Sequence, residues 1–165
     1  MKSKSQIIII GFILIGGLTG CPYESPVPLG DSCNSTIDPT LAGTWVYRSG
    51  KNPGDTIIFM KFNDHEYYIE FHGEGKSAIN IASRGRGFIT KIRNQTIINF
   101  CEIDHPEKVY FSRYEMHDNM MILRTASDNF IKQTIGSSGK LLDFYSKNME
   151  KDGFYEKADT VIRVK

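Results

Sequence analysis

Residues 66–72, Glu-Tyr-Tyr-Ile-Glu-Phe-His, alternate between apolar and polar side chains. The apolar face of this stretch carries Tyr67, Ile69 and Phe71. A period of two is typical of a β-strand that buries one face and exposes the other. The stretch therefore predicts a half-buried strand.

Comparable apolar stretches recur along the chain at the spacing of about 8 to 12 residues that is typical of an antiparallel barrel or sandwich. The sequence predicts these further strands at residues 41–48, 55–63, 77–83, 87–93, 96–103, 108–117, 119–126 and 159–165. We expect a bend at Arg84-Gly85-Arg86, between two of them. A hairpin should turn at Asp118-Asn119.

One helix is expected to interrupt this pattern near the C-terminus. Either Ser137 or Ser138 can cap its start, and Gly153 can end it. Its apolar face consists of Leu141, Leu142, Tyr145 and Met149. We therefore predict a mostly β fold with about eight antiparallel strands and one helix near the C-terminus.

The N-terminus has the features of an export signal. Lys2 and Lys4 form a short positive region, and the following 14 residues, 7–20, contain no ionisable side chain. At 1.5 Å per residue such a stretch is too short to cross about 30 Å of hydrocarbon comfortably. It matches the apolar region of a secretory signal peptide instead.

Residues 18–21, Leu-Thr-Gly-Cys, resemble the lipobox of bacterial lipoproteins. The resemblance covers residues 1–21 and implies that residues 1–20 are removed and that Cys21 carries a diacylglycerol. The protein would then be anchored in the cell envelope by its lipid. Pro22 takes the position where aspartate is the usual inner-membrane signal, so the resemblance implies the outer membrane in a Gram-negative source.

Residues 21–40 are expected to form a tether, because four of the six prolines of the chain lie there among Ser, Asn, Asp and Gly. Proline favours extended chain, so this segment would be a semi-stiff spacer between the lipid and a domain at residues 41–165.

Composition limits the kinds of protein that the mature chain can be. Removal of residues 1–20 leaves 145 residues, enough for one domain, and the loss of Lys2 and Lys4 lowers the formal net charge from +1 to −1. A near-neutral domain lacks the excess of positive charge that is typical of nucleic-acid-binding proteins. Cys33 and Cys101 remain besides Cys21, and they can form a disulfide in an exported protein or stay as two separate thiols.

Residues 41–45, Leu-Ala-Gly-Thr-Trp, resemble the Gly-x-Trp opening of lipocalins and related up-and-down barrels. The resemblance implies a lipocalin-like antiparallel barrel in which Trp45 plugs one end and a ligand enters at the other. Because the tether joins the domain near Leu41, we expect the open end to face away from the anchoring membrane. The Thr-Asp-Tyr triplet found late in lipocalin barrels is absent.

A second resemblance, to a group of small uncharacterised bacterial lipoproteins, rests on residues 128–132, Asp-Asn-Phe-Ile-Lys. It also includes Ser137, Ser138 and residues 21–23, Cys-Pro-Tyr. It implies no activity.

Few residues indicate catalysis or metal binding. His65, Glu66, Glu70 and His72 lack the spacing of a closed metal site, and a solvated polar face is the better interpretation. Cys101 lies in an apolar stretch, where a buried inert thiol or a disulfide partner is the expected role, and no Gly-x-Ser-x-Gly elbow is present. We expect no enzymatic activity, no cofactor and no metal.

The Arg84-Gly85-Arg86-Gly87 segment could attract an anion or a lipid headgroup, but an exposed turn is the simpler reading.

Two functions follow from a barrel of this kind. Either it binds a small apolar ligand or lipid, or it has a filled core and docks another envelope protein. The residues expected to line a ligand cavity, if they do not simply fill the core, are Tyr67, Ile69, Phe71, Phe88 and Phe100.

Overall fold

The computed structural model describes residues 22–50, 53–73 and 81–164, so the predicted signal peptide at residues 1–20 and Cys21 lie outside the described residues. The described elements are a short 3-10 helix η1 (Ser32–Asn34), eight strands and one α-helix. The strands and the α-helix are β1 (Gly43–Ser49), β2 (Thr56–Lys61), β3 (Tyr67–His72), β4 (Ile81–Ile92), β5 (Gln95–Glu102), β6 (Val109–His117), β7 (Met120–Thr125), α1 (Ser138–Asn148) and β8 (Asp159–Arg163).

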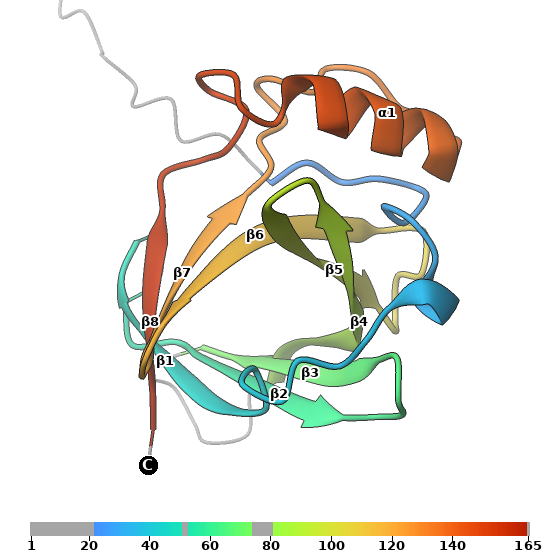
Figure 1. Cartoon of the computed structure of the whole chain (residues 1–165). Helices are drawn as coiled ribbons and strands as arrows, with labels where there is room; N and C mark the ends of the chain where they lie inside the picture. The colour runs from blue at the N-terminus through green and yellow to red at the C-terminus, as the bar shows by residue number, and fades with distance from the viewer. Residues whose placement is uncertain (1–21, 51–52, 74–80, 165) are drawn as a thin grey trace, which may run out of the picture.

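The eight strands form a closed barrel in which each strand pairs antiparallel with its neighbours in sequence. β8 returns to β1, with Tyr47 opposite Val161, and thereby closes the sheet. Closure leaves no free edge strand. Figure 1 shows the barrel with α1 lying across its outer side. The predicted antiparallel up-and-down barrel with one helix near the C-terminus is confirmed.

The bend expected at Arg84-Gly85-Arg86 is wrong, because β4 runs through it without interruption. Gly85 and Gly87 both lie on the inner face of this strand. A side chain at Gly85 would collide with the ring of Phe100, and one at Gly87 would collide with Ile69. Glycine is used here because larger side chains from β3 and β5 occupy the space over β4.

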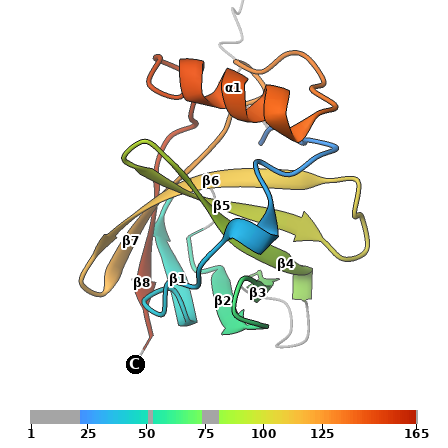
Figure 2. The same cartoon turned by 45° about the vertical axis from the view of Figure 1, so that its right-hand side comes forward.

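Apolar side chains form two cores, one inside the barrel and one outside it. The inner core includes Trp45, Phe59 and Met121. The outer core lies between α1 and the outer face of β5 and β6, where Tyr145 of α1 meets Phe111 of β6 with ring centroids 6.0 Å apart. Figure 2 shows α1 covering that side of the barrel.

The expectation of a free spacer at residues 21–40 is wrong for the described part, residues 22–40, because this segment packs against the outside of the barrel and passes beneath α1 on the way. Leu29 is fully buried in the outer core, and its backbone N–H donates to Asn99 Oδ1 at 2.7 Å. The Ser138 hydroxyl, at the start of α1, bonds the backbone of Gly30. Figure 1 shows this segment, in blue, running beneath α1.

Trp45 closes one end of the barrel from within. Its side chain is fully buried, and Nε1 donates to the Leu41 carbonyl oxygen at 2.9 Å. The Arg163 guanidinium lies 4.7 Å from the centre of the indole ring and also bonds the carbonyl oxygens of Thr40 and Ala42. The indole is thus held between the core and a cation, an arrangement that stabilises aromatic rings.

Candidate functional site

A cavity of about 330 Å³ occupies the half of the barrel opposite Trp45. Because the strands alternate in direction, this open end is where β1, β3, β5 and β7 finish and the other strands begin. The volume lies at the lower end of the range of about 300 to 1,000 Å³ that small-molecule sites occupy. The barrel is therefore filled by its own side chains at the Trp45 end and hollow at the other end.

The deep part of the cavity is apolar. Its floor and lower wall are formed by Ile57, Phe59, Ile69, Ile98 and Leu123. Phe71 and Phe100 form an aromatic wall above this floor, with ring centroids 5.1 Å apart and planes at 80°. Edge-to-face packing of this kind fixes both rings and leaves an apolar surface for a ligand.

The mouth of the cavity is polar and carries three carboxylates, Glu24, Glu102 and Asp159. Glu102 accepts a hydrogen bond from the Ser83 hydroxyl at 2.7 Å. Glu24 accepts one from the Tyr110 hydroxyl at 2.9 Å, and Lys108 Nζ lies 3.6 Å from its other oxygen.

No lysine, arginine or histidine is among the described residues that line the cavity. Among the described residues, three carboxylates against the ammonium group of Lys108 give the mouth hydrogen-bond acceptors and a net negative charge above an apolar interior.

Two tyrosines at the mouth stay neutral. Burial, followed by the nearby carboxylates of Asp159 and Asp55, raises the pKa of Tyr47 above its usual value. Burial and then the hydrogen-bonded Glu24 raise the pKa of Tyr110. Both hydroxyls therefore keep their protons near neutral pH, and the Tyr110 hydroxyl uses its proton in the hydrogen bond to Glu24.

The structure brings three of the five predicted ligand-binding residues to the cavity: Ile69, Phe71 and Phe100 line it, and Tyr67 and Phe88 do not. Phe88 stands opposite Asn99 in the β4–β5 register, on the outer face of the barrel that the N-terminal segment covers.

Tyr67 points inward but lies at the closed end. Its hydroxyl donates to the Asp38 carbonyl oxygen at 2.8 Å, and Tyr114 donates to the carboxylate of the same residue at 3.0 Å. Burial raises the pKa of Tyr67 to about 12, against the opposing effect of the Asp38 backbone N–H, which donates to the Tyr67 hydroxyl oxygen at 2.6 Å.

Several lining residues were not anticipated. Pro22 and Glu24 belong to the segment expected to be a spacer, and nothing local in that sequence distinguishes a free chain from a bound one. Ser112, Leu123 and Asp159 lie on predicted strands, and alternation could have found Ser112 and Leu123 as inward positions.

Cys33 and Cys101 are separate thiols in the structure rather than a disulfide. Cys33 is exposed in η1, whereas Cys101 lies on the outer face of β5, opposite Val109 of β6. Burial raises the pKa of the Cys101 thiol, which makes it a poor nucleophile.

The remaining candidate side chains have partners elsewhere. Arg86 pairs with Glu66 and covers the ring of Phe62, while Arg84 lies 3.7 Å from Asp104, so these arginines do not form an exposed anion-binding turn. Across the described residues, no three histidine, cysteine or acidic side chains are placed to share a metal ion.

No protein-family model matches the chain, and neither a curated protein nor a solved structure gives a match. Fold and site therefore define its class: a closed eight-stranded antiparallel barrel with a cavity at one end. Within the described part of the chain, no helix has the length and apolar character needed to cross a membrane.

Proposed function

We propose that this chain is a non-enzymatic envelope lipoprotein, lipidated at Cys21, whose barrel binds one small amphiphilic molecule. The cavity of about 330 Å³ opposite Trp45 carries the proposal. A barrel that only docked another protein would have no need of an apolar cavity, so the cavity favours ligand binding over docking with a filled core.

The cavity's chemistry suggests the ligand's two parts. Ile69, Phe100 and Leu123 suit an apolar body such as a single hydrocarbon chain. Each buried methylene contributes about 0.8 kcal/mol, so eight of them would give about 6 kcal/mol and a Kd of some tens of micromolar. The carboxylates of Glu24 and Glu102 suit a polar end that donates hydrogen bonds or carries positive charge.

The ligand proposal predicts selectivity for the charge of the head. In titrations of the barrel chain, residues 22–165, an alkylamine should bind at least about tenfold more tightly than a fatty acid of equal chain length. A unit charge a few ångströms from a carboxylate is worth a few kcal/mol at an effective dielectric constant near 20, and tenfold needs only about 1.4 kcal/mol. Displacement of a bound hydrophobic fluorescent probe measures both affinities.

A matched variant separates charge from shape. Glu102→Gln keeps the size of the side chain, so it should reduce the advantage of the amine and leave binding of an uncharged alcohol unchanged. Equal affinity of the native barrel for the amine and the fatty acid would contradict the role of the carboxylates. Failure of every probe to saturate the folded barrel would contradict ligand binding itself.

The lipoprotein proposal is tested separately at Cys21. Cys21→Ser should leave uncut precursor that carries no lipid, because a serine hydroxyl cannot form the thioether to the diacylglycerol. The mass of the product and its fractionation between membrane and soluble extract measure this. Cys33→Ser is the control and should be processed normally, and normal processing of Cys21→Ser would contradict the proposal.

A further inference from the structure

The first described residue lies at the mouth of the cavity and not at the plugged end. Pro22 lines the cavity and forms an antiparallel bridge with Ser127, which follows β7 by two residues. The next residue, Tyr23, donates its backbone N–H to the Ala126 carbonyl oxygen at 2.9 Å. The N-terminal segment therefore starts at the open end and runs along the outer face to the closed end, where β1 begins.

This start of the segment is firmly attached to the barrel. Ser25 and Val109 exchange two backbone hydrogen bonds of 2.9 Å, so the segment adds a short antiparallel pairing to β6. The ring of Tyr23 is only 4% exposed and packs against Phe111 at a centroid distance of 6.3 Å. Buried rings and paired backbone resist local opening, so no slack chain separates Pro22 from the barrel.

We infer that the open end of the barrel faces the anchoring membrane and that the cavity takes its amphiphile from that bilayer. The inference rests on the proposed lipidation of Cys21 and deepens the proposed function. Adjacent Cα atoms are 3.8 Å apart, so a lipid on Cys21 is attached one residue from the cavity rim. The geometry reverses the expectation that the open end points away from the membrane.

The covalent attachment, not an apolar patch, sets this orientation. Among the described residues, the large apolar side chains with the greatest exposure are Met60, Phe62, Ile103 and Val164, and of these Ile103 alone lies at the open end. Six of the eight strands have six to nine residues and span about 20 to 30 Å at 3.3 Å per residue, so the closed end is held a barrel's length from the anchor. A hydrocarbon chain that leaves the bilayer at the anchor meets the cavity first.

Fluorescence quenching by the bilayer tests this orientation, because Trp45 is the single tryptophan of the chain and lies at the closed end. The lipid-anchored protein, purified from the membranes of the producing bacterium, is placed in vesicles whose phospholipid chains carry bromine, which quenches tryptophan on close approach. His105→Trp adds a reporter in the β5–β6 loop at the open end, where the native side chain is 56% exposed. Asp64→Trp adds one in the β2–β3 turn at the closed end, where the native side chain is 85% exposed.

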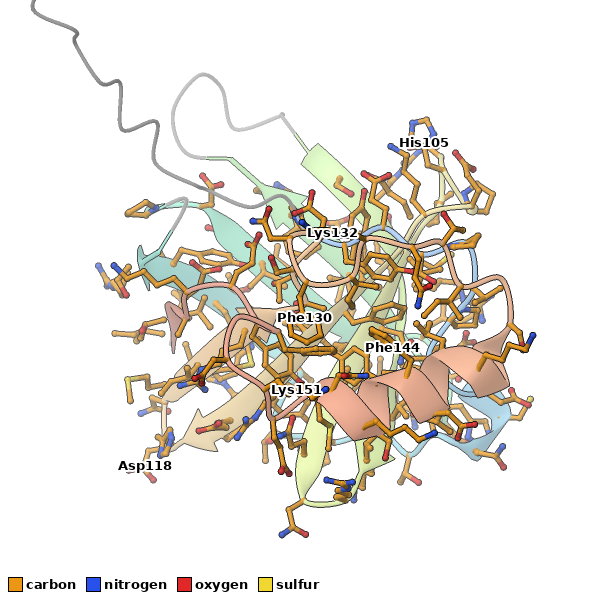
Figure 3. The ribbon with its side chains drawn as sticks, turned by 90° about the horizontal axis from the view of Figure 1, so that it is seen from above. His105, Asp118, Phe130, Lys132, Phe144 and Lys151 are labelled. Carbon is orange, nitrogen blue, oxygen red and sulfur yellow. The ribbon has the colours of Figure 1, made fainter. Side chains whose placement is uncertain are left out.

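The two reporters should behave differently. The emission added by His105→Trp should be largely lost in brominated vesicles, and the emission of Trp45 and of Asp64→Trp should be preserved. Figure 3 shows how far apart the ends are, with His105 of the open end and Asp118 of the closed end at opposite edges of the molecule. Preferential quenching at position 64, or equal quenching at both positions, would overturn the inference.

The outcome can be separated from failure of the proposed function. A protein that carries no lipid on Cys21 overturns the orientation and the lipoprotein proposal together, but leaves probe binding by the barrel chain as an independent result. A barrel that binds no probe and is quenched at position 105 keeps the orientation and overturns the transfer of an amphiphile.

As a direct readout of transfer, a fluorescent single-chain amphiphile in the vesicles should move into anchored protein faster than into the barrel chain free in solution. Equal rates would overturn the membrane as source.

Discussion

Replacing Trp45 by alanine is expected to lower the free energy of unfolding by about 3 to 5 kcal/mol, the usual cost of removing a fully buried large aromatic side chain. The indole is fully buried, donates a hydrogen bond to Leu41 and lies against the Arg163 guanidinium. The substitution removes all three interactions and leaves a void beneath the cation. A domain of this size has about 5 to 15 kcal/mol of stability, so much of it would be lost.

Urea unfolding of the barrel chain, followed by circular dichroism, measures the effect of Trp45→Ala. Ile103→Ala is the control, because that side chain is 45% exposed at the other end and its loss should change stability by about 0.5 kcal/mol or less. Trp45→Phe should fall between the two, since it keeps an aromatic ring but loses the hydrogen bond. An unchanged melting temperature for Trp45→Ala would contradict its place as the plug.

Replacing Ser112 by tryptophan is expected to abolish ligand binding. Ser112 lies on the cavity wall, opposite Ile98 in the β5–β6 register, and its hydroxyl pairs with that of Thr125 at 2.9 Å. An indole at this position would take up the space between the apolar floor and the mouth. Because the cavity offers room, the cost to stability should stay within the 1 to 3 kcal/mol that is typical of overpacking, about what the fold can tolerate.

Probe titration with a matched tryptophan variant measures this loss. Asp64→Trp places the same side chain in an exposed turn at the closed end and should bind the probe as the native barrel does. Phe71→Ala widens the aromatic wall instead, and it should shift the preference toward bulkier amphiphiles. A folded Ser112→Trp protein that binds with native affinity would show that the probe sits elsewhere.

The barrel itself was predictable because its signal is local. Each strand shows alternation or a short apolar stretch bounded by turn residues, and the positions of β3 and β6 agree with the prediction to within one residue at each end. The prediction of two strands separated by a bend, where the structure has the single strand β4, is wrong for a physical reason. In the sequence, Gly85 and Gly87 indicate a turn. In the structure, they leave space for Phe100 and Ile69 inside a continuous strand.

The placement of residues 22–40 was not predictable, because proline-rich composition suits a free spacer and an extended segment bound to a surface equally well. The partners that hold it, Val109 and Asn99, lie more than sixty residues further along the chain. Alternation also gives the face of a side chain but not its depth along the barrel axis. For that reason Ile69 and Phe71 line the cavity, whereas Tyr67, on the same face of β3, lies at the closed end.

Native mass spectrometry of the barrel after export tests the central claim most directly. The chain from Pro22 is exported with a cleavable signal that adds no lipid, so that it folds among the amphiphiles of the envelope, and it is purified without detergent. We predict a complex with one small amphiphile for each barrel, and loss of that added mass in Ser112→Trp. A native barrel that carries only its own mass, and that binds no added amphiphile at concentrations well above the expected Kd, would contradict the account.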